Sequence, residues 1–231
     1  MRYGKQAATW LLVALVLLGL AGCRQQDDTD VGQTDDGELV LGRSEAVERV
    51  TRAVSPGGRA LVLDGFNGAV RLEGTDADVA RLVFEKRGRG PDDAAAREVL
   101  GDVELEEQGD AGRYVFTMRS DEPVRSAVDV RGTVPRGAAL RVDFTSGPVV
   151  LDGLEGPIEV EHQSGDVQIA GAASRVRVGI RNGDIELALR ALPQGADVEL
   201  TTTNGDITLA LPPDASAQID AETQAGAVRP P

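Results

Sequence analysis

The chain has 231 residues, a formal net charge of −14 and only 3% aromatic residues. This length suits one sizeable domain, and the negative charge excludes direct charge attraction to nucleic acid, which we therefore do not expect as a partner. With so few aromatic side chains, the core must consist mainly of Val, Leu, Ile and Ala, and stacked β-structure packs such side chains well.

Residues 1–22 have the features of a bacterial export signal. Two basic residues precede an apolar stretch, Ala7–Leu20, which is too short for a comfortable membrane span. The sequence Leu20-Ala21-Gly22-Cys23 then resembles the lipobox of bacterial lipoproteins, and this resemblance implies cleavage before Cys23 and acylation of its thiol. The alternative is an uncleaved anchor helix with a chance cysteine. Because Cys23 is the only cysteine, no internal disulfide is expected.

Residues 23–45 are expected to form a flexible, acidic tether between the lipid and the folded domain. The segment 24–38 is polar and has almost no large apolar side chain, so it buries too little surface to offset the entropy of chain ordering. In enteric bacteria an Asp directly after the acylated cysteine tends to keep a lipoprotein in the inner membrane. Arg24 stands at that position, which favours the outer membrane or the periplasm over the inner membrane.

The folded domain is expected over residues 46–231 and begins with short strands separated by turn signals. The strand candidates of this first part are Glu48–Val54, Arg59–Asp64, Ala69–Glu73 and Val79–Lys86. A helix is predicted over 92–100, because Pro91 and two Asp residues suit its first turn and Gly101 can end it. Alternating apolar residues on both sides of a turn at 109–112 then predict a β-hairpin.

A six-residue phrase recurs in the second half of the domain. It is written S-G-P-V-V-L at 146–151, S-G-D-V-Q-I at 164–169, N-G-D-I-E-L at 182–187 and N-G-D-I-T-L at 204–209. The phrase glycines Gly147, Gly165, Gly183 and Gly205, together with Gly226, are 18, 18, 22 and 21 residues apart. Gly68 is a candidate origin for an earlier, degenerate unit. After Val228 the pattern breaks off, so either Pro230-Pro231 blunts an open sheet edge or the natural chain continues.

Each unit alternates apolar and polar residues around its glycine. The apolar residues around Gly183, for example, are Val176, Val178, Ile180, Ile185 and Leu187. This period of two predicts a strand, a tight turn in which glycine adopts a positive φ, and a second strand. Such units could stack as the coils of a parallel β-solenoid, or they could pair as an antiparallel β-meander or sandwich.

The outward residues favour the solenoid. Six places before the glycines stand Arg141, Glu159, Arg177, Glu199 and Asp220. Parallel stacking would bring these side chains into one ladder whose charges alternate over the first four positions. Opposite charges on neighbouring strands stabilise a sheet by roughly 0.2–1 kcal/mol each. The expected fold is therefore all-β, a β-solenoid or β-helix of coils of about 18–22 residues with one short helix inserted.

The recurring phrase, (S/N)-G-(D/P)-(V/I)-x-(L/I), resembles that of the bacterial "putative adhesin" domains of unknown function, which are relatives of the head-GIN group. The resemblance covers residues 46–231 and is strongest at 140–211. It implies a β-helix-like fold and no established enzyme activity.

Two groups of residues suggest chemistry but also have a purely structural explanation. Asp166, Asp184 and Asp206 follow their glycines and could hold calcium, although one acid per coil is sparse and these side chains also suit turns. His162, the only histidine, is expected on the inward face level with Phe144, as a buried hydrogen-bonded residue rather than a catalytic base. No metal, cofactor or catalytic residue is expected.

The sequence is expected to encode a non-catalytic lipoprotein of the bacterial cell envelope, attached to the membrane through Cys23. Its β-domain would serve a structural or adhesive role and would bind an envelope or cell-surface protein. The alternatives are a polysaccharide-active β-helix enzyme and an envelope signalling accessory. A concave groove with paired carboxylates and a basic residue would favour the enzyme, and a uniform polar wall would favour the interaction module.

Overall fold

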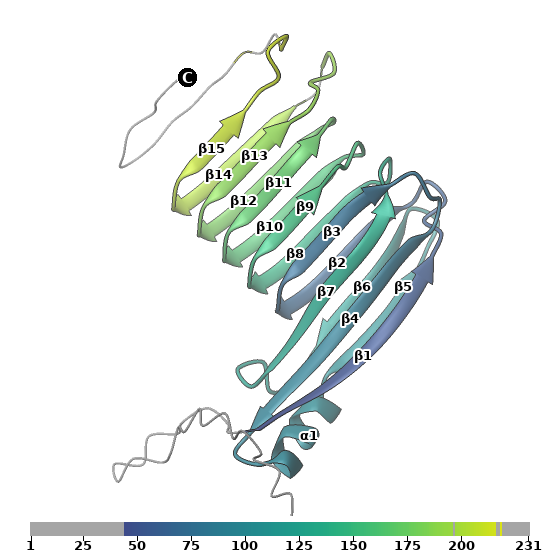
Figure 1. The fold of residues 1–231 in the computed structure, drawn as a ribbon, viewed down its shortest axis with the longest axis vertical. Helices are drawn as coiled ribbons and strands as arrows, with labels where there is room; N and C mark the ends of the chain where they lie inside the picture. The colour runs from purple at the N-terminus through teal and green to yellow at the C-terminus, as the bar shows by residue number, and fades with distance from the viewer. Residues whose placement is uncertain (1–43, 196, 216–217, 219–231) are drawn as a thin grey trace, which may run out of the picture. The chain divides into compact units, whose positions relative to one another are not determined.

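The computed structural model of the chain describes residues 44–195, 197–215 and 218. The predicted signal peptide, Cys23, most of the tether and the fifth repeat unit, which begins at Ile219, lie outside the described residues. Within the described part, one helix and two β-sheets form the fold (Figure 1). No helix of this part is long and apolar enough to cross a membrane.

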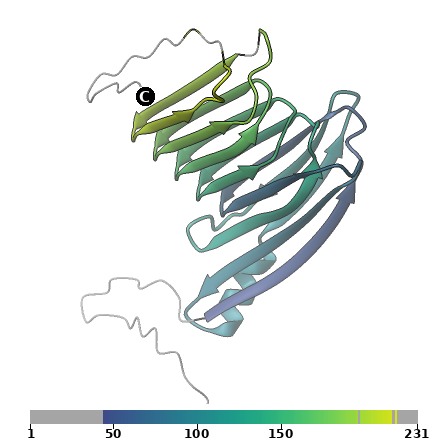
Figure 2. The ribbon, with the colours of Figure 1, turned by 45° about the horizontal axis from the view of Figure 1, so that its top comes forward.

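The two sheets lie face to face (Figure 2), and the side chains on their inner faces form one hydrophobic core. The eight-stranded sheet contains, in spatial order, β1 (Ser44–Val54), β4 (Ala80–Gly90), β7 (Ser126–Pro135), β3 (Val70–Thr75), β9 (Val149–Asp152), β11 (Val167–Ala172), β13 (Ile185–Leu189) and β15 (Ile207–Ala210). The seven-stranded sheet contains β14 (Val198–Asn204), β12 (Val176–Asn182), β10 (Ile158–Ser164), β8 (Leu140–Ser146), β2 (Ala60–Asn67), β6 (Arg113–Arg119) and β5 (Glu104–Gly109).

The repeat units are coils that stack in parallel, which confirms the solenoid and excludes the meander for this part of the chain. In the seven-stranded sheet Val160 pairs with Val178, and Val178 pairs with Leu200, on parallel neighbouring strands. Val160 and Val178 are fully buried, and Leu200 in the last described coil is half-buried. The degenerate unit around Gly68 is also a coil, because β2 and β3 pair in parallel with β8 and β9.

Residues 80–139 are inserted after the first coil, which β2 and β3 form. Their strands β6 and β7 pair with the edges of this coil that face away from β8 and β9. Here β1, β4 and β7 pair antiparallel, and so do β5 and β6, while β7 and β6 pair in parallel with β3 and β2. The sequence pattern predicts no strand at the residues of β7. The alternation of Val128 and Val130 is present there, but Gly132 and Pro135 follow it and weaken the pattern.

The predicted helix is present as α1 (Asp93–Gly101) and packs against β4 and β1. The Oδ1 atom of Asp92 accepts a hydrogen bond of 2.9 Å from the backbone N–H of Ala95, which caps the first turn. Two glycines of β4 allow the close approach, because a Cβ atom at Gly88 would lie 2.6 Å from the carbonyl oxygen of Ala96. Strands β1 and β4 are longer than the predicted strands 48–54 and 79–86, because the two pair with each other along the whole of Ser44–Val54.

The core consists mainly of aliphatic rungs, as the composition predicts. Its largest fully buried side chains are Phe84, Phe116, Phe144, Leu61, Leu63, Leu82, Leu151, Leu154, Ile158, Ile169, Ile185 and Leu187. Burying one such side chain contributes about 1.5–3 kcal/mol. The three phenylalanines come from β4, β6 and β8, at and beside the first coil, whereas the later coils contribute only aliphatic residues to this list.

Candidate functional site

The outer face of the seven-stranded sheet carries a row of side chains in register across every strand. From β14 to β5 the row contains Glu199, Arg177, Glu159, Arg141, Val62, Val115 and Gln108. The Nη1 atom of Arg141 donates to Glu159 Oε1 at 2.8 Å, and the Nε atom of Arg177 donates to Glu199 Oε2 at 2.8 Å. The predicted charge ladder is therefore confirmed over four coils, and its fifth member, Asp220, lies outside the described residues.

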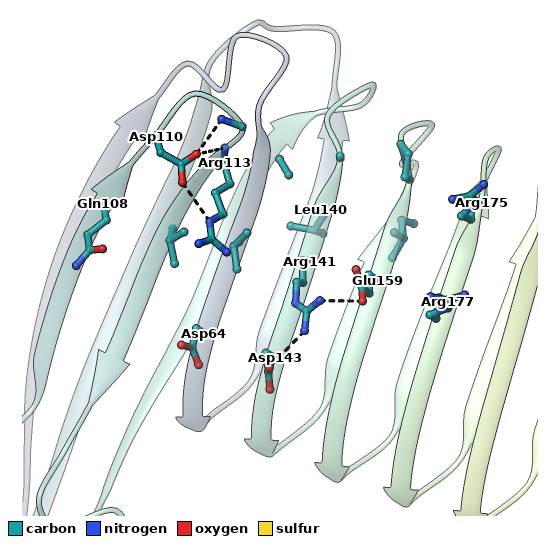
Figure 3. A pocket seen from close by; sticks show the side chains of 17 residues that line it. Asp64, Gln108, Asp110, Arg113, Leu140, Arg141, Asp143, Glu159, Arg175 and Arg177 are labelled. Carbon is teal, nitrogen blue, oxygen red and sulfur yellow. Dashed lines mark hydrogen bonds and ion pairs between the residues drawn. The ribbon is translucent and has the colours of Figure 1, made fainter.

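A groove of about 1040 Å³ crosses this face over β6, β2, β8, β10 and β12 (Figure 3). Its lining includes Val62 and Val115, which are cross-strand partners on β2 and β6. Both valines occupy outward positions, where alternation normally places polar side chains, and both are half-buried. The groove therefore has a mixed lining, in which this outward apolar pair stands among charged side chains and the smaller apolar surfaces of the strand ends.

Cationic side chains line the groove near the first residues of its strands. Arg113 begins β6, and Arg175 directly precedes β12, next to Pro157. The Nε atom of Arg113 donates to Asp110 Oδ2 at 3.3 Å. Hydrogen bonds from the backbone N–H groups of Gly112 and Arg113 hold the pKa of the Asp110 carboxyl below its usual value. Arg175 forms no ion pair with any carboxylate that the structure describes.

Carboxylates line the groove on the other side of the two valines. Asp64 of β2 and Asp143 of β8 are in-register partners on parallel strands, and Figure 3 shows both on the outer wall. Partial burial raises the pKa of the Asp64 carboxyl, and the charge of Asp143 raises it further, against the opposing effects of Arg119 and Arg141. Glu161 continues the row beside Asp143. Three acids therefore stand side by side in this row, whereas the charges of the neighbouring ladder alternate in sign.

We predict that Asp64→Asn stabilises the fold at neutral pH. A carboxyl whose pKa is higher in the folded than in the unfolded state destabilises the fold when it is ionised, and this cost disappears as the pH falls below the unfolded value. Removing a like-charge cross-strand pair should raise the free energy of unfolding by about 0.2–1 kcal/mol at pH 7. Urea unfolding at pH 7 and pH 3 measures the effect, which should vanish at pH 3.

The control for this substitution is Asp121→Asn, which changes an exposed acid that makes no hydrogen bond or ion pair with the described residues. It should change the free energy of unfolding by less than about 0.5 kcal/mol at either pH. A loss of stability in Asp64→Asn at pH 7 would show that Asp64 is held by favourable contacts rather than by repulsion from Asp143.

His162 lies where the sequence predicts it, on the inward face of β10 and in register with Phe144. It is 6% exposed, and its two ring nitrogens lie 2.9 Å from the carbonyl oxygen of Phe144 and 2.7 Å from that of Gly147. Both contacts reach the preceding coil, so His162 links two coils and faces neither the groove nor a nucleophile among the described side chains.

The turn aspartates also connect successive coils. The backbone N–H of Asp184 donates to Asp166 Oδ1 at 3.0 Å, and that of Asp206 donates to Asp184 Oδ1 at 2.8 Å. These hydrogen bonds explain one Asp per coil without calcium. Among the described residues no group of three or more His, Cys, Asp or Glu side chains is arranged to hold a metal ion.

The sequence pattern alone does not reveal the groove. Its central strands β2, β6 and β8 are brought together by residues 80–139, whose path the repeat pattern does not reveal. One signal is visible in the sequence. Val62 stands between the inward Leu61 and Leu63, at a position where the strand pattern calls for a polar residue. Cys23, the predicted lipidation site, lies outside the described residues.

Comparison with known proteins relates the chain to one family. The family model described as Toastrack DUF4097 matches residues 92–231. No curated protein matches the chain significantly.

Several solved structures are similar at low identity. A "putative cell adhesion protein" from Clostridium sporogenes is 10% identical, with 71% of this chain and 99% of that chain covered and a TM-score of 0.43. A "putative lipid binding protein" from Parabacteroides distasonis is 8% identical, with 69% of this chain and 96% of that chain covered and a TM-score of 0.25. A "putative adhesin" from Bacteroides fragilis is 12% identical, with 70% of this chain and 97% of that chain covered and a TM-score of 0.21.

Proposed function

The chain belongs to the Toastrack DUF4097 family, and we propose that it is a non-catalytic lipoprotein of the bacterial cell envelope whose β-solenoid is an interaction module. In this proposal the groove of the seven-stranded sheet is the docking surface for an envelope or cell-surface protein. The lipobox-like sequence ending at Cys23 supports the lipid anchor, and the acidic segment after it supports a tether. The formal net charge of −14 argues against nucleic acid as the partner.

The observation that carries the docking role is the combination of side chains in the groove. Val62 and Val115 provide an outward apolar pair, and arginines and carboxylates line the same groove. Protein interfaces likewise combine apolar side chains, which are desolvated on binding, with polar side chains at the rim. The strands beneath are paired on both sides, so the backbone holds these side chains in fixed positions.

A polysaccharide-active enzyme is the second candidate, because the groove contains the features that this alternative requires. Asp64 and Asp143 are paired carboxylates, Arg141 lies beside them, and a carboxyl with a raised pKa can act as a general acid. Glycoside hydrolysis needs two carboxylates that flank one scissile bond. Asp64 and Asp143 project from neighbouring strands of a single wall, and no aromatic platform for a sugar lines the groove in the described part. Docking therefore ranks first.

The anchor is tested by mass spectrometry of the protein purified from bacterial membranes. The mature chain should begin at Cys23 and carry acyl groups, and Cys23→Ala should leave residues 1–22 attached. An unmodified thiol on a chain that still begins at Met1 would contradict the anchor while leaving the docking role open.

The docking role is tested by photo-crosslinking in intact cells. A photoreactive amino acid at Gln108, on the rim of the groove, should crosslink to a protein, and Arg141→Glu in the same chain should abolish the adduct. The matched control is the same probe at Gln168, an outward residue of β11 in the other sheet, which should give no adduct. Absence of an adduct at Gln108, together with turnover of a glycan library, would overturn the proposal in favour of the enzyme.

A further inference from the structure

We propose that the groove binds an extended polypeptide segment in which an aliphatic side chain stands between an acidic and a basic residue, each two positions away. This inference rests on the proposed docking function and names the chemistry of the partner. It follows from three rows of side chains that cross the groove at right angles to its strands.

The middle row supplies the aliphatic contact. Val62 and Val115 are cross-strand partners, and the row continues with Arg141 on one side and Gln108 on the other. Neighbouring side chains already cover part of both valines. One Leu or Ile side chain placed over this pair would remove the remaining apolar surface from water, which is the main source of affinity at such a contact.

The first row supplies a cation beside β2. Arg113 is the register partner of Ala60, which stands two residues before Val62 on the outer face of β2. Arg113 shares one N–H group with Asp110, which leaves the other N–H groups of its guanidinium for a carboxylate of the partner.

The third row supplies carboxylates. Asp64 stands two residues after Val62, and Asp143 stands beside Asp64 on β8. Arg141 lies 3.8 Å from Asp143 but directs its shorter contact, 2.8 Å, to Glu159. The two aspartates therefore lack a full counter-charge, and an ammonium or guanidinium group of the partner would supply it.

The spacing of the rows fixes the form of the partner. Consecutive outward residues of a strand are about 6.6 Å apart, so the three rows span about 13 Å along β2. An extended peptide has the same spacing between side chains on one face. A sequence of the type Glu-x-Leu-x-Lys, lying along β2, would place its three alternate side chains over the cationic, apolar and acidic rows together.

Short peptides test the proposal against the full-length chain in detergent. The probe Ser-Glu-Thr-Leu-Thr-Lys-Ser, blocked at both ends, should bind at least about tenfold more tightly than the version with Ser in place of Leu, as measured by NMR titration or calorimetry. Versions with two Glu or two Lys should bind more weakly than the mixed probe. Equal affinity for all versions would overturn the proposal.

Charge-reversed protein variants show whether the rows face the peptide as described. The double substitution Asp64→Lys and Asp143→Lys should abolish the preference for the mixed probe and create a preference for the version with two Glu. Glu186→Lys, on the outer face of β13 in the other sheet, should leave all affinities unchanged. If the double variant does not fold, Val115→Glu provides the second test and should weaken the mixed probe at least about tenfold.

The outcomes separate this inference from the proposed function. If the peptides fail to bind while a probe at Gln108 still crosslinks a protein, the docking role stands and the peptide chemistry is wrong. If an oligosaccharide binds and the double variant abolishes that binding, the partner is a glycan and the inference is overturned.

Discussion

Gly183→Ala is expected to lower the free energy of unfolding by about 3–5 kcal/mol. Gly183 has a φ of 138°, a conformation that only glycine adopts without strain. A Cβ atom at this position would overlap the backbone of Gly165 in the preceding coil, whose carbonyl carbon would lie 2.7 Å away. Alanine must therefore both strain its own turn and separate two stacked coils. The urea midpoint of unfolding measures the loss.

Gly101→Ala is the matched control. Gly101 ends α1 without a positive φ, and a Cβ atom there would meet nothing within 4 Å. Because alanine is the better helix former, this variant should be as stable as the parent or more stable by up to about 1 kcal/mol. Equal losses in the two variants would contradict the close approach of the coils at Gly183.

Leu187→Ala should cost about 2–5 kcal/mol, whereas the same change at Leu209 should cost less than about 1 kcal/mol. The two residues occupy equivalent positions in consecutive coils and are register partners on β13 and β15. Leu187 is fully buried between neighbouring coils, so truncation leaves a cavity. Leu209 is only half-buried, so truncating its side chain removes less buried apolar surface.

The comparison needs no other control, because one substitution is made twice in the same local sequence. Chemical denaturation gives both values, and hydrogen exchange should show β15 opening at a lower free energy than β13. A loss at Leu209 as large as that at Leu187 would contradict this prediction and would show that a further layer covers the side chain of Leu209.

The sequence predicts the coils well because two local rules agree. Alternation sets which side chains point inward, and glycine marks each turn where positive φ is required, as at Gly147 and Gly165. The charge ladder adds the direction of pairing, because Arg141 and Glu159 become neighbours only when the strands run in parallel. Both rules concern residues that recur at the same position of every repeat unit, so they can be recognised from the sequence.

The groove could not be predicted, because it depends on contacts that no repeat encodes. Val62 pairs with Val115 only after an excursion of some fifty residues through β4, α1 and β5. Asp64 and Asp143 both stand four places before a unit glycine, Gly68 and Gly147, but the long segment between them hides that β2 and β8 are adjacent strands. Surface charges also carry little energy, so the pattern of core residues places almost no constraint on where acids and bases gather.

The alternating charge ladder bears on how such a chain could change its length by duplication or deletion. Arg141, Glu159, Arg177 and Glu199 face one another coil by coil. Loss of the single coil that carries Glu159 would bring Arg141 against Arg177 and create a like-charge contact. Loss of two consecutive coils would instead bring Arg141 against Glu199. Related genes should therefore gain and lose coils in even numbers more readily than in odd ones, unless a compensating charge reversal accompanies the event.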